Sequence, residues 1–520
     1  MKRTTAVAII ASTLLLATAF NAGAQQKLVD IELWAFGTVS EAGPPPDDWV
    51  AYKIIREKLG INLKVVLQPS SPSDQDAKIS VAGAANSLPD YFAVNRDMFL
   101  KLAKQGLLAP VDNMYPMMPN RTRTHYFDPM RNKLAKVGGK SYGLADFGAM
   151  EKVEGAVIRK DWLDKLGLKV PKTLDEYLAV AKAFKEKDPD GNGINDTYGF
   201  GSIIESTGIS TAGLGRRFDY MLGAFGLAGM WNLENAAKFQ LNFRDPDFRK
   251  ALEFVKKVND EKLIDPDWPV LKKDDFRARW KQGRFGIMWE QFAALHQLAN
   301  YKDFDKNFPN GEWIPIAPPV GPKGLSSNGV NQMNARIYAV SAKAAKAGKM
   351  EAIARLLEWM TTEEGYYLFG FGVDGVNYKK DAKGYVTVDG IPTESQYTHK
   401  SQAPLTQLRN MVFVNNDIEL QARYVTHKSA NGKMINPLAT WKFFQNSPYT
   451  EGTAASLIDP PSNANDFKRF YDENLVSFVL GQQPLNDQTW AAFVKGMDSL
   501  GAAAYEKAQK AKLMEAGLLD

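Results

Sequence analysis

The stretch VDIELWAF, residues 29–36, alternates apolar and polar side chains, the period of two that is typical of a β-strand with one buried face. Three prolines at residues 44–46 separate it from a segment with helical spacing. The alternation then continues with a helix over residues 48–59, a strand at 61–67, a helix over 74–85, a strand at 89–94 and a helix over 99–106. This βαβαβ order predicts an α/β fold with a parallel sheet covered by helices on both faces.

A second α/β unit is expected to begin near Gly139. Thr173 and Glu176 have the spacing of a capping box, in which each side chain accepts a hydrogen bond from the other residue's backbone, so a helix should begin after Thr173 and end at Asp188. Further strands are expected at residues 156–159, 285–289 and 313–317, and further helices at 161–166, 248–259, 274–282, 292–300, 349–361 and 487–511.

The segment KDPDGNGINDTYGF, residues 187–200, carries oxygen-bearing side chains at alternate positions. A calcium loop takes side-chain oxygens from positions 1, 3, 5 and 9 and a backbone carbonyl from position 7, with glycine at position 6 for the sharp turn. Gly193 stands at position 6, whereas Gly199 stands where an EF-hand carries its glutamate. We expect a structural calcium ion; the alternative is an Asx-rich turn held by its own hydrogen bonds. The expected ligands are Asp188, Asp190, Asn192, the carbonyl of Ile194, and Asp196.

The first 24 residues have the pattern of a secretory signal peptide. Lys2 and Arg3 precede an apolar run over residues 4–20, and the small residues 22–24 suit cleavage. A membrane anchor agrees less well with this pattern than a signal peptide does, because the apolar run is too short to cross a bilayer comfortably. The chain has no cysteine, so it lacks disulfides, thiolate metal sites and a lipid-accepting cysteine after the signal. We therefore expect a periplasmic protein.

The charge of the chain is nearly balanced. The formal net charge is +5, and removing the signal peptide with Lys2 and Arg3 leaves +3 on about 496 residues, which argues against a nucleic-acid-binding protein. With 45% hydrophobic residues the chain can bury large cores, and its length predicts two or three globular units.

Five stretches give the chain a family resemblance. It resembles the family 1 extracellular solute-binding proteins of ABC importers, in particular the subgroup of alginate-oligosaccharide-binding proteins. The stretches follow one another in order over nearly the whole chain after the signal peptide. They are LPDYFAVNRDMFLKLAKQGLLAPVD (88–112), the segment from GKSYGL to NDTYGF (139–200), WKQGRFGIMWEQF (280–292), LLEWMTTEEGYYLFGFGVDGVNY (356–378) and FVLGQQPLNDQTWAAFVKGMDSLGAAAYEKA (478–508).

The resemblance implies a two-lobed periplasmic-binding-protein fold, similar to type II, with the ligand in a cleft between the lobes. It also implies delivery to permease subunits in the inner membrane, a monomer, and a structural calcium ion in loop 188–197. Members often carry an acid directly after the residue that matches Asp196; this chain has Thr197, whose hydroxyl could still supply an oxygen. The lobes are expected to divide the mature chain into residues 25–135 and 290–345 for the N-lobe, and residues 136–289 and 346–520 for the C-lobe.

Aromatic side chains are the first candidates for sugar binding. A pyranose stacks its C–H face on an aromatic ring, and polar side chains bind its hydroxyl rim. Most large aromatics are nevertheless core residues. The four chosen tryptophans are Trp34 at the end of the first strand, Trp231 after a glycine-rich stretch, Trp289 at the end of FGIM, and Trp441 in ATWKFF.

Four polar residues complete the candidate site. Arg96 follows a strand end, where ligands of parallel sheets bind, and Arg336 precedes a strand. Either arginine could bind a carboxylate in bidentate fashion, which would suit a uronate sugar, or be an ordinary surface ion pair. The full polar set is Arg96, Glu154, Gln291 and Arg336.

Two other classes of protein remain as alternatives. A secreted polysaccharide-degrading enzyme, a glycosidase or a lyase, would also place aromatics and carboxylates around a cleft. A peptide-binding importer component would need an extended groove for backbone groups. The G-x-G-x-x-G match at residues 370–375 follows a helical run rather than a strand, and the four histidines lack metal-ligand spacing. We therefore expect an oligosaccharide-binding protein without catalytic residues.

Overall fold

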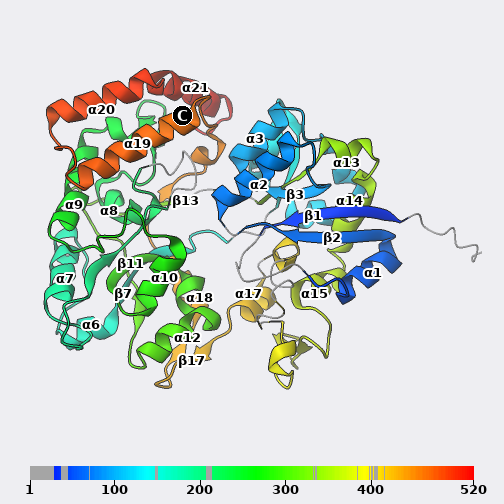
Figure 1. Ribbon diagram of the computed structural model, residues 1–520, viewed down its shortest axis with the longest axis horizontal. Helices are drawn as coiled ribbons and strands as arrows, with labels where there is room; N and C mark the ends of the chain where they lie inside the picture. The colour runs from blue at the N-terminus through cyan, green and yellow to red at the C-terminus, as the bar shows by residue number, and fades with distance from the viewer. Residues whose placement is uncertain are drawn as a thin grey trace, which may run out of the picture.

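The computed structural model describes residues 28–36, 45–69, 71–146, 150–205, 213–331, 333, 336–382, 384–397, 399, 402, 408–414 and 416–520. The predicted signal peptide at residues 1–24 lies outside them. Figure 1 shows two α/β lobes side by side, each built around its own sheet. The predicted α/β class is therefore confirmed.

The first sheet contains the strands that the opening stretch of the sequence predicts. β1 (Val29–Ala35) pairs in parallel with both β2 (Ile61–Leu67) and β3 (Tyr91–Val94). β14 (Arg336–Val340) then lies antiparallel between β3 and β6 (Gly143–Asp146). The order is β2-β1-β3-β14-β6, so the sheet is mixed rather than wholly parallel, and one of its strands comes from far along the chain.

Helices cover this sheet because each has one apolar face. In α1, for example, Ala51, Ile55 and Leu59 are buried at helical spacing. The apolar residues of 342–371 pack into the same core as β1 and β2. The helices of this lobe are α1 (Val50–Leu59), α2 (Pro72–Ala84), α3 (Arg96–Lys104), α4 (Pro119–His125), α5 (Pro129–Asn132), α13 (Ala342–Lys346), α14 (Met350–Trp359) and α15 (Glu363–Phe371).

The second sheet has the order β12-β7-β11-β8. β11 (Phe285–Gln291) is antiparallel to β7 (Glu154–Arg159) and parallel to β8 (Tyr198–Gly201), while β12 (Trp313–Pro315) pairs with β7. Gly286 lets α7 approach β11 closely, because a Cβ at this position would lie 2.1 Å from the Phe184 ring.

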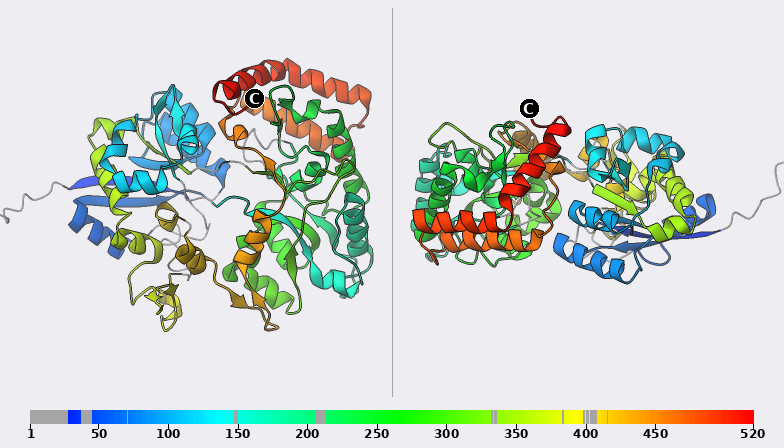
Figure 2. Two further views of the ribbon diagram at one scale, coloured as in Figure 1. Left: turned by 180° about the vertical axis from the view of Figure 1, so that it is seen from behind. Right: turned by 90° about the horizontal axis from the view of Figure 1, so that it is seen from above.

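The second lobe is richer in helices (Figure 2). The predicted capping box opens α7: Thr173 accepts from the backbone of Glu176, whose carboxylate accepts from the backbone of Thr173. The single helix predicted over residues 487–511 is two helices, since Gly501 has a φ of 90°, a left-handed conformation that a continuous helix cannot contain. The helices are α6 (Lys160–Lys165), α7 (Leu174–Glu186), α8 (Asp219–Leu222), α9 (Pro246–Asp260), α10 (Lys273–Lys281), α11 (Phe292–His296), α12 (Leu298–Asn307), α18 (Pro437–Gln445), α19 (Ala464–Val479), α20 (Asp487–Ser499) and α21 (Ala502–Glu515).

The lobes divide the chain at other places than expected. β6 pairs in the first sheet, so the first crossing follows residue 146 rather than 135. β12 belongs to the second sheet, so most of 290–345 lies in the second lobe. Residues 342–371 pack in the first lobe, although 346–520 were expected in the second. Strand pairing between distant segments decides these boundaries, and local sequence signals do not contain it.

The last connection between the lobes passes through α17 (Asp417–Arg423), which lies between them in Figure 1. Its Ala422 packs in the first-lobe core, and its Leu420 packs with apolar residues of the second lobe. Short strand pairs complete the described fold: β4 (Lys136–Val137) with β5 (Lys140–Ser141), β9 (Trp231–Asn232) with β10 (Gln240–Leu241), β13 (Val330–Asn331) with β19 (Thr450–Glu451), β15 (Lys379–Lys380) with β16 (Val386–Thr387), and β17 (His427–Lys428) with β18 (Met434–Ile435).

None of the helices in the described ranges is both long enough and apolar enough to cross a membrane.

A fully buried ion pair ties α4 to the first sheet. Arg121 Nη2 lies 2.8 Å from Asp146 Oδ2, and the two side chains are 0% and 1% exposed. The Arg121 Nε also donates to the Tyr126 hydroxyl. Because a buried charge is costly without its partner, removing one member of such a pair costs more than the pair itself contributes.

We predict that Arg121→Leu lowers the free energy of unfolding by about 3–5 kcal/mol, because Asp146 would keep a buried charge without its partner. Arg469→Ala removes one member of an exposed pair with Asp466 and should cost less than about 1 kcal/mol. Urea denaturation of both variants measures the difference. Equal losses would contradict this role of the buried pair.

Candidate ligand-binding site

One edge of the second sheet gathers two of the predicted polar residues. β8 and β11 end at Gly201 and Gln291, and the antiparallel β7 begins at Glu154. Gln291 and Glu154 are register partners on neighbouring strands. This edge is the carboxyl end of two parallel strands, the place where open α/β sheets bind ligands.

Two consecutive arginines that the sequence analysis did not select bind this edge. Arg216 Nη1 lies 3.0 Å from Glu154 Oε2, and its Nη2 lies 3.6 Å from Glu205 Oε1. Arg217 Nε donates to Glu205 Oε2 at 2.7 Å. The network extends through Arg217 to Glu290, which Arg277 also binds, and through Glu205 to Lys273.

Burial and charge oppose each other at these carboxylates. Burial raises the pKa of Glu290, but the charges of Arg217 and Arg277 and their hydrogen bonds outweigh it and bring the pKa down to about 2. Glu205 behaves in the same way: its pKa is held far below its usual range by Arg217, Arg216 and Lys273. The network therefore keeps its charges at neutral pH and holds the strand ends in place.

Trp289 supports this network and does not offer a free ring face for stacking. It is only 4% exposed, and its Nε1 donates to the Asn328 carbonyl at 2.8 Å. The guanidinium groups of Arg216 and Arg217 lie 5.6 and 5.7 Å from its ring centroid. Two cations thus lie over the ring that the sequence predicted to bind sugar.

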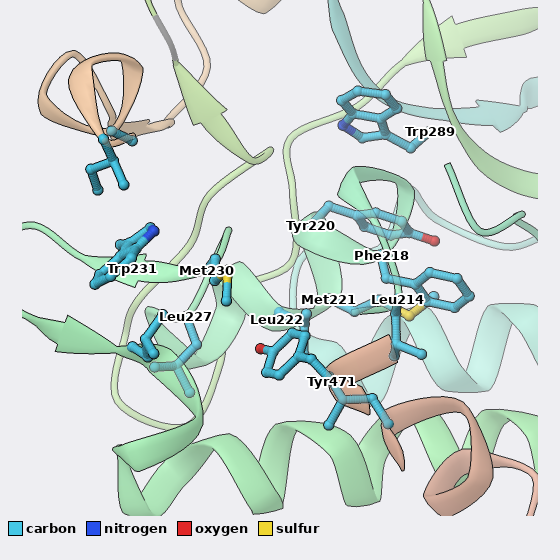
Figure 3. Close-up of a cluster of buried hydrophobic side chains, with 14 of the residues drawn as sticks. Leu214, Phe218, Tyr220, Met221, Leu222, Leu227, Met230, Trp231, Trp289 and Tyr471 are labelled. Atoms are coloured by element: carbon cyan, nitrogen blue, oxygen red, sulfur yellow. The ribbon is translucent and has the colours of Figure 1, made fainter. Parts of the chain in front are cut away.

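Trp231 is a core residue. It is 3% exposed, its ring stacks on Phe239 with centroids 5.0 Å apart, and Tyr505 approaches it edge-on. Figure 3 shows it beside Leu227 and Met230 in an apolar cluster that includes residues of both lobes. Burial on this scale removes Trp231 from the predicted ligand-facing set.

The other two tryptophans are half-buried. Trp34 lies at the end of β1 with the Lys78 ammonium 4.3 Å from its ring centroid, and its Nε1 donates to Glu32. Trp441, on α18, donates its Nε1 to the carbonyl of Glu151 in the first connection between the lobes. Its ring centroid is 6.4 Å from that of Phe292. Trp441 is therefore bound to the first connection between the lobes.

The two predicted arginines also lie at this junction. Arg96, at the start of α3, binds Asp459 Oδ1 at 3.0 Å and the Ile458 carbonyl at 3.1 Å, so it bridges the lobes. Arg336, at the start of β14, donates to the Asn410 carbonyl at 3.4 Å. Arg96 is thus already bound to a protein carboxylate, whereas Arg336 donates to a carbonyl at the long distance of 3.4 Å and pairs with no carboxylate in the described ranges.

The predicted calcium loop forms a tight turn on its own. The Asp188 carboxylate accepts from the backbone N–H groups of residues 191, 192 and 193 at 3.0–3.1 Å. Asn192 Nδ2 donates to Asp190 and Asp196. Gly193 has a φ of 77°, as the sharp turn requires. These hydrogen bonds are those of the alternative reading, an Asx-rich turn.

Two observations bear on whether the loop fits a cation. Asp190 Oδ1 is buried without a hydrogen-bond partner, and burial beside Asp188 raises the pKa of Asp190. Both features are expected of a carboxylate oxygen that coordinates a cation. Within the described ranges, however, no group of three or more His, Cys, Asp or Glu side chains converges on one point, so the loop would have to turn its oxygens inward. The Thr197 hydroxyl donates to the Phe184 carbonyl in the core instead.

The residues that sequence reasoning missed are Glu205, Arg216, Arg217, Arg277 and Glu290. A signal for one of them was present: Glu290 is a charged residue at the end of the otherwise apolar stretch FGIMW, where only a paired charge is tolerated. The arginine pair at residues 216–217 has no comparable local signature.

The model of the family described as "Bacterial extracellular solute-binding protein" matches residues 49–367. Among curated proteins, the chain is 27% identical over 346 residues to the polygalacturonan/rhamnogalacturonan-binding protein YtcQ of Bacillus subtilis strain 168, covering 65% of this chain and 64% of YtcQ. It is 26% identical to Lipoprotein LipO of the same organism, covering 69% and 68%. The match thus spans just under two thirds of YtcQ.

Two solved structures share the fold. One is the Streptococcus pneumoniae substrate-binding protein FusA, an EF-hand mutant in complex with fructo-nystose, with a TM-score of 0.69 at 16% identity over 94% of this chain and 99% of FusA. The other is the alginate-binding protein AlgQ2 without calcium ion, with a TM-score of 0.67 at 19% identity over 93% and 97%. At these identities the likeness concerns the fold alone.

We predict that Glu290→Gln flattens the acid dependence of stability. The folded pKa of Glu290 is about 2 against an ordinary 4.5, so its contribution is present above pH 4.5 and is lost as the pH falls toward 2. Urea denaturation of wild type and variant between pH 2 and 7 should therefore show curves that differ most at neutral pH and approach each other in acid. Parallel curves would contradict the low pKa.

Proposed function

The chain belongs to the bacterial extracellular solute-binding protein family, and from this premise we propose that it captures an oligosaccharide and delivers it to an ABC transporter. The family match over residues 49–367 carries the proposal, because it covers more than half of the chain. Membership in a family of binding proteins also confirms the prediction of a binding role over that of a polysaccharide-degrading enzyme. The sugar ligands named for relatives such as YtcQ and FusA support an oligosaccharide as the ligand class.

The ligand is proposed to bind between the two lobes. The carboxyl edge of the second sheet, with Glu154 and Gln291, and the Arg336 end of β14 in the first sheet are the parts of the fold that suit it. Trp441 supplies a half-buried ring at the junction. A ligand that contacts both lobes favours their closed arrangement, because only that arrangement satisfies all of its contacts.

The setting of this activity is the periplasm. The signal-peptide pattern at residues 1–24 supports an exported protein. The partners are the permease subunits of the transporter in the inner membrane, and the binding protein acts as a monomer. Nothing in the balanced net charge favours a nucleic-acid partner.

A structural calcium ion in loop 188–197 is part of the same proposal. Asp188, Asp190, Asn192, the Ile194 carbonyl and Asp196 would hold it, and the partnerless Asp190 Oδ1 supports the assignment. The ion would neutralise three crowded carboxylates and fasten the end of α7 to β8. The Thr197 side chain, which bonds to the end of α7, fastens that helix directly.

We predict that an oligosaccharide raises the melting temperature of the protein, with a stabilisation of about 2.7 kcal/mol at 100 times its dissociation constant. Trp441→Ala should weaken this binding by about 1 kcal/mol, the loss of one stacked ring. Trp490→Phe, in α20 of the second lobe, is the matched control and should leave the affinity unchanged. A thermal-shift screen followed by calorimetry measures both. Stabilisation by no sugar, or release of sugar fragments by purified protein, would contradict the proposal.

We predict that a calcium chelator lowers the melting temperature and that added calcium restores it, because the ion is bound only by the folded loop. Asp190→Ala should abolish this response. Asp164→Ala removes a carboxylate from an exposed pair on α6 and should keep it. The calcium site would be refuted if the chelator had no effect and elemental analysis of the purified protein found no calcium.

A further inference from the structure

Three arginines meet where the first lobe joins α17. Arg336 begins β14, Arg409 lies in the short helix over residues 409–411, and Arg423 ends α17. Asn410 joins two of them: its carbonyl accepts from Arg336 Nη1 at 3.4 Å, and its side-chain oxygen accepts from Arg423 Nη2 at 3.5 Å. We call Arg336, Arg409 and Arg423 the arginine cluster.

Arg409 differs from the other buried arginines of this protein. It is 9% exposed, yet its guanidinium forms neither an ion pair nor a hydrogen bond with another described residue. The Tyr397 ring, 5.9 Å away, is its neighbour in a cation–π contact. Arg121, Arg131, Arg159 and Arg217 are all buried as well, and each has a carboxylate partner. A buried cation without a partner is unfavourable, so its retention calls for an anion from elsewhere.

The charge of Arg423 acts on the pKa of the other two arginines of the cluster. Burial and the charge of Arg423 lower the pKa of Arg409 to about 10, and the same two causes lower the pKa of Arg336. Arginine side chains in proteins carry a positive charge at neutral pH. The three guanidinium groups form a concentrated positive site that an anion would stabilise.

The carboxylates near the cluster have donors of their own. Asp146 is bound by Arg121. Glu419 accepts from the backbone of Val414 and Asn416 and from the Tyr366 hydroxyl. Glu41 is the one acidic residue of the sequence that falls outside the described ranges. The carboxylates of Asp146 and Glu419 are therefore already bound by groups other than Arg409.

Aromatic rings adjoin the arginine cluster on the side of the second lobe. Tyr424 directly follows Arg423, and its ring centroid is 4.8 Å from that of Phe292. Phe292 in turn lies beside Trp441. A cationic site next to aromatic side chains matches the two parts of an acidic sugar, which has an apolar C–H face and a carboxylate on the ring.

We propose that the arginine cluster binds the carboxylate of a uronic-acid residue, so that the oligosaccharide captured by this protein is acidic. This inference rests on the proposed function and names its ligand class. Arg409 is the central anion-binding residue, because no described residue forms an ion pair or hydrogen bond with its guanidinium, and the nearby Arg336 and Arg423 add positive charge. A planar guanidinium matches a carboxylate with two parallel hydrogen bonds, a geometry that a neutral sugar hydroxyl cannot complete.

Calorimetry with three probes tests the charge dependence. The probes are trigalacturonate, its methyl ester, which keeps the shape and loses the charge, and a sulfated neutral trisaccharide. We expect trigalacturonate to bind at least tenfold more tightly than the ester, and its affinity to fall with added salt. Equal affinity for acid and ester, or a preference for the sulfated sugar, would overturn the inference while leaving oligosaccharide capture intact. Failure of every sugar, including a wider neutral panel, would overturn both.

Substitutions at Arg409 test whether this residue causes the preference for the acidic sugar over its methyl ester. Arg409→Gln should remove the preference for the acid over the ester, and Arg409→Lys should retain part of it. Arg469→Gln, which changes an exposed arginine on α19, is the matched control and should retain all of it. A preference unchanged in Arg409→Gln would overturn the assignment.

Stability of the unliganded protein gives an independent readout. Because no carboxylate in the described ranges pairs with Arg409, Arg409→Gln should leave the melting temperature without sugar unchanged or raise it. A fall of several degrees would show that Arg409 is a structural residue and would overturn its assignment to a ligand.

Discussion

The compensation of buried charge organises this protein more than any other constraint. Arg217 is almost completely buried, and it is tolerated because Glu205, Glu290 and the Trp289 carbonyl all accept from it. These acceptors lie at the ends of β8 and β11, so satisfying one guanidinium fixes the edge of the second sheet. Arg121 does the same for the first sheet through Asp146. Without these pairs, both strand edges at the junction of the lobes would lose the groups that hold them.

The same constraint explains how the two lobes are joined. Arg96 of the first lobe binds Asp459 of the second, and Asp459 also binds Lys512 of α21. This contact is only partly buried, with side chains 17% and 29% exposed. An ion pair of this kind costs less to break than a buried one, so it would oppose a relative movement of the lobes less than a buried pair would. The rigid pairs lie within the lobes, and the weaker pair lies between them.

The arginine cluster departs from the pairing of buried arginines with carboxylates. In the described part of the chain, the arginines buried within the lobes have protein partners, whereas Arg409 does not. Its neighbours Leu408, Met411 and Tyr397 pack in the first-lobe core, and Arg423 at the end of α17 is close enough to lower its pKa. A binding protein gains selectivity when its site has polar groups that only the correct ligand satisfies.

A structural feature could be predicted from the sequence when it depends on a few neighbouring residues, and could not when it depends on distant ones. The strand β2 over residues 61–67 and the cap at Thr173 were predicted where they occur, because alternation and capping are properties of a few neighbouring residues. The motifs of residues 88–112 and 139–200 likewise identified the family from the sequence alone. Of the candidate residues, Glu154 and Gln291 lie on neighbouring strands as register partners, a pairing that the sequence did not predict, while Trp231 and Trp289 are buried. The sequence by itself determined the elements and the family. The tertiary structure alone decided the lobe boundaries, the burial of those rings and the missing partner of Arg409, because each depends on pairing and packing between segments far apart in the chain.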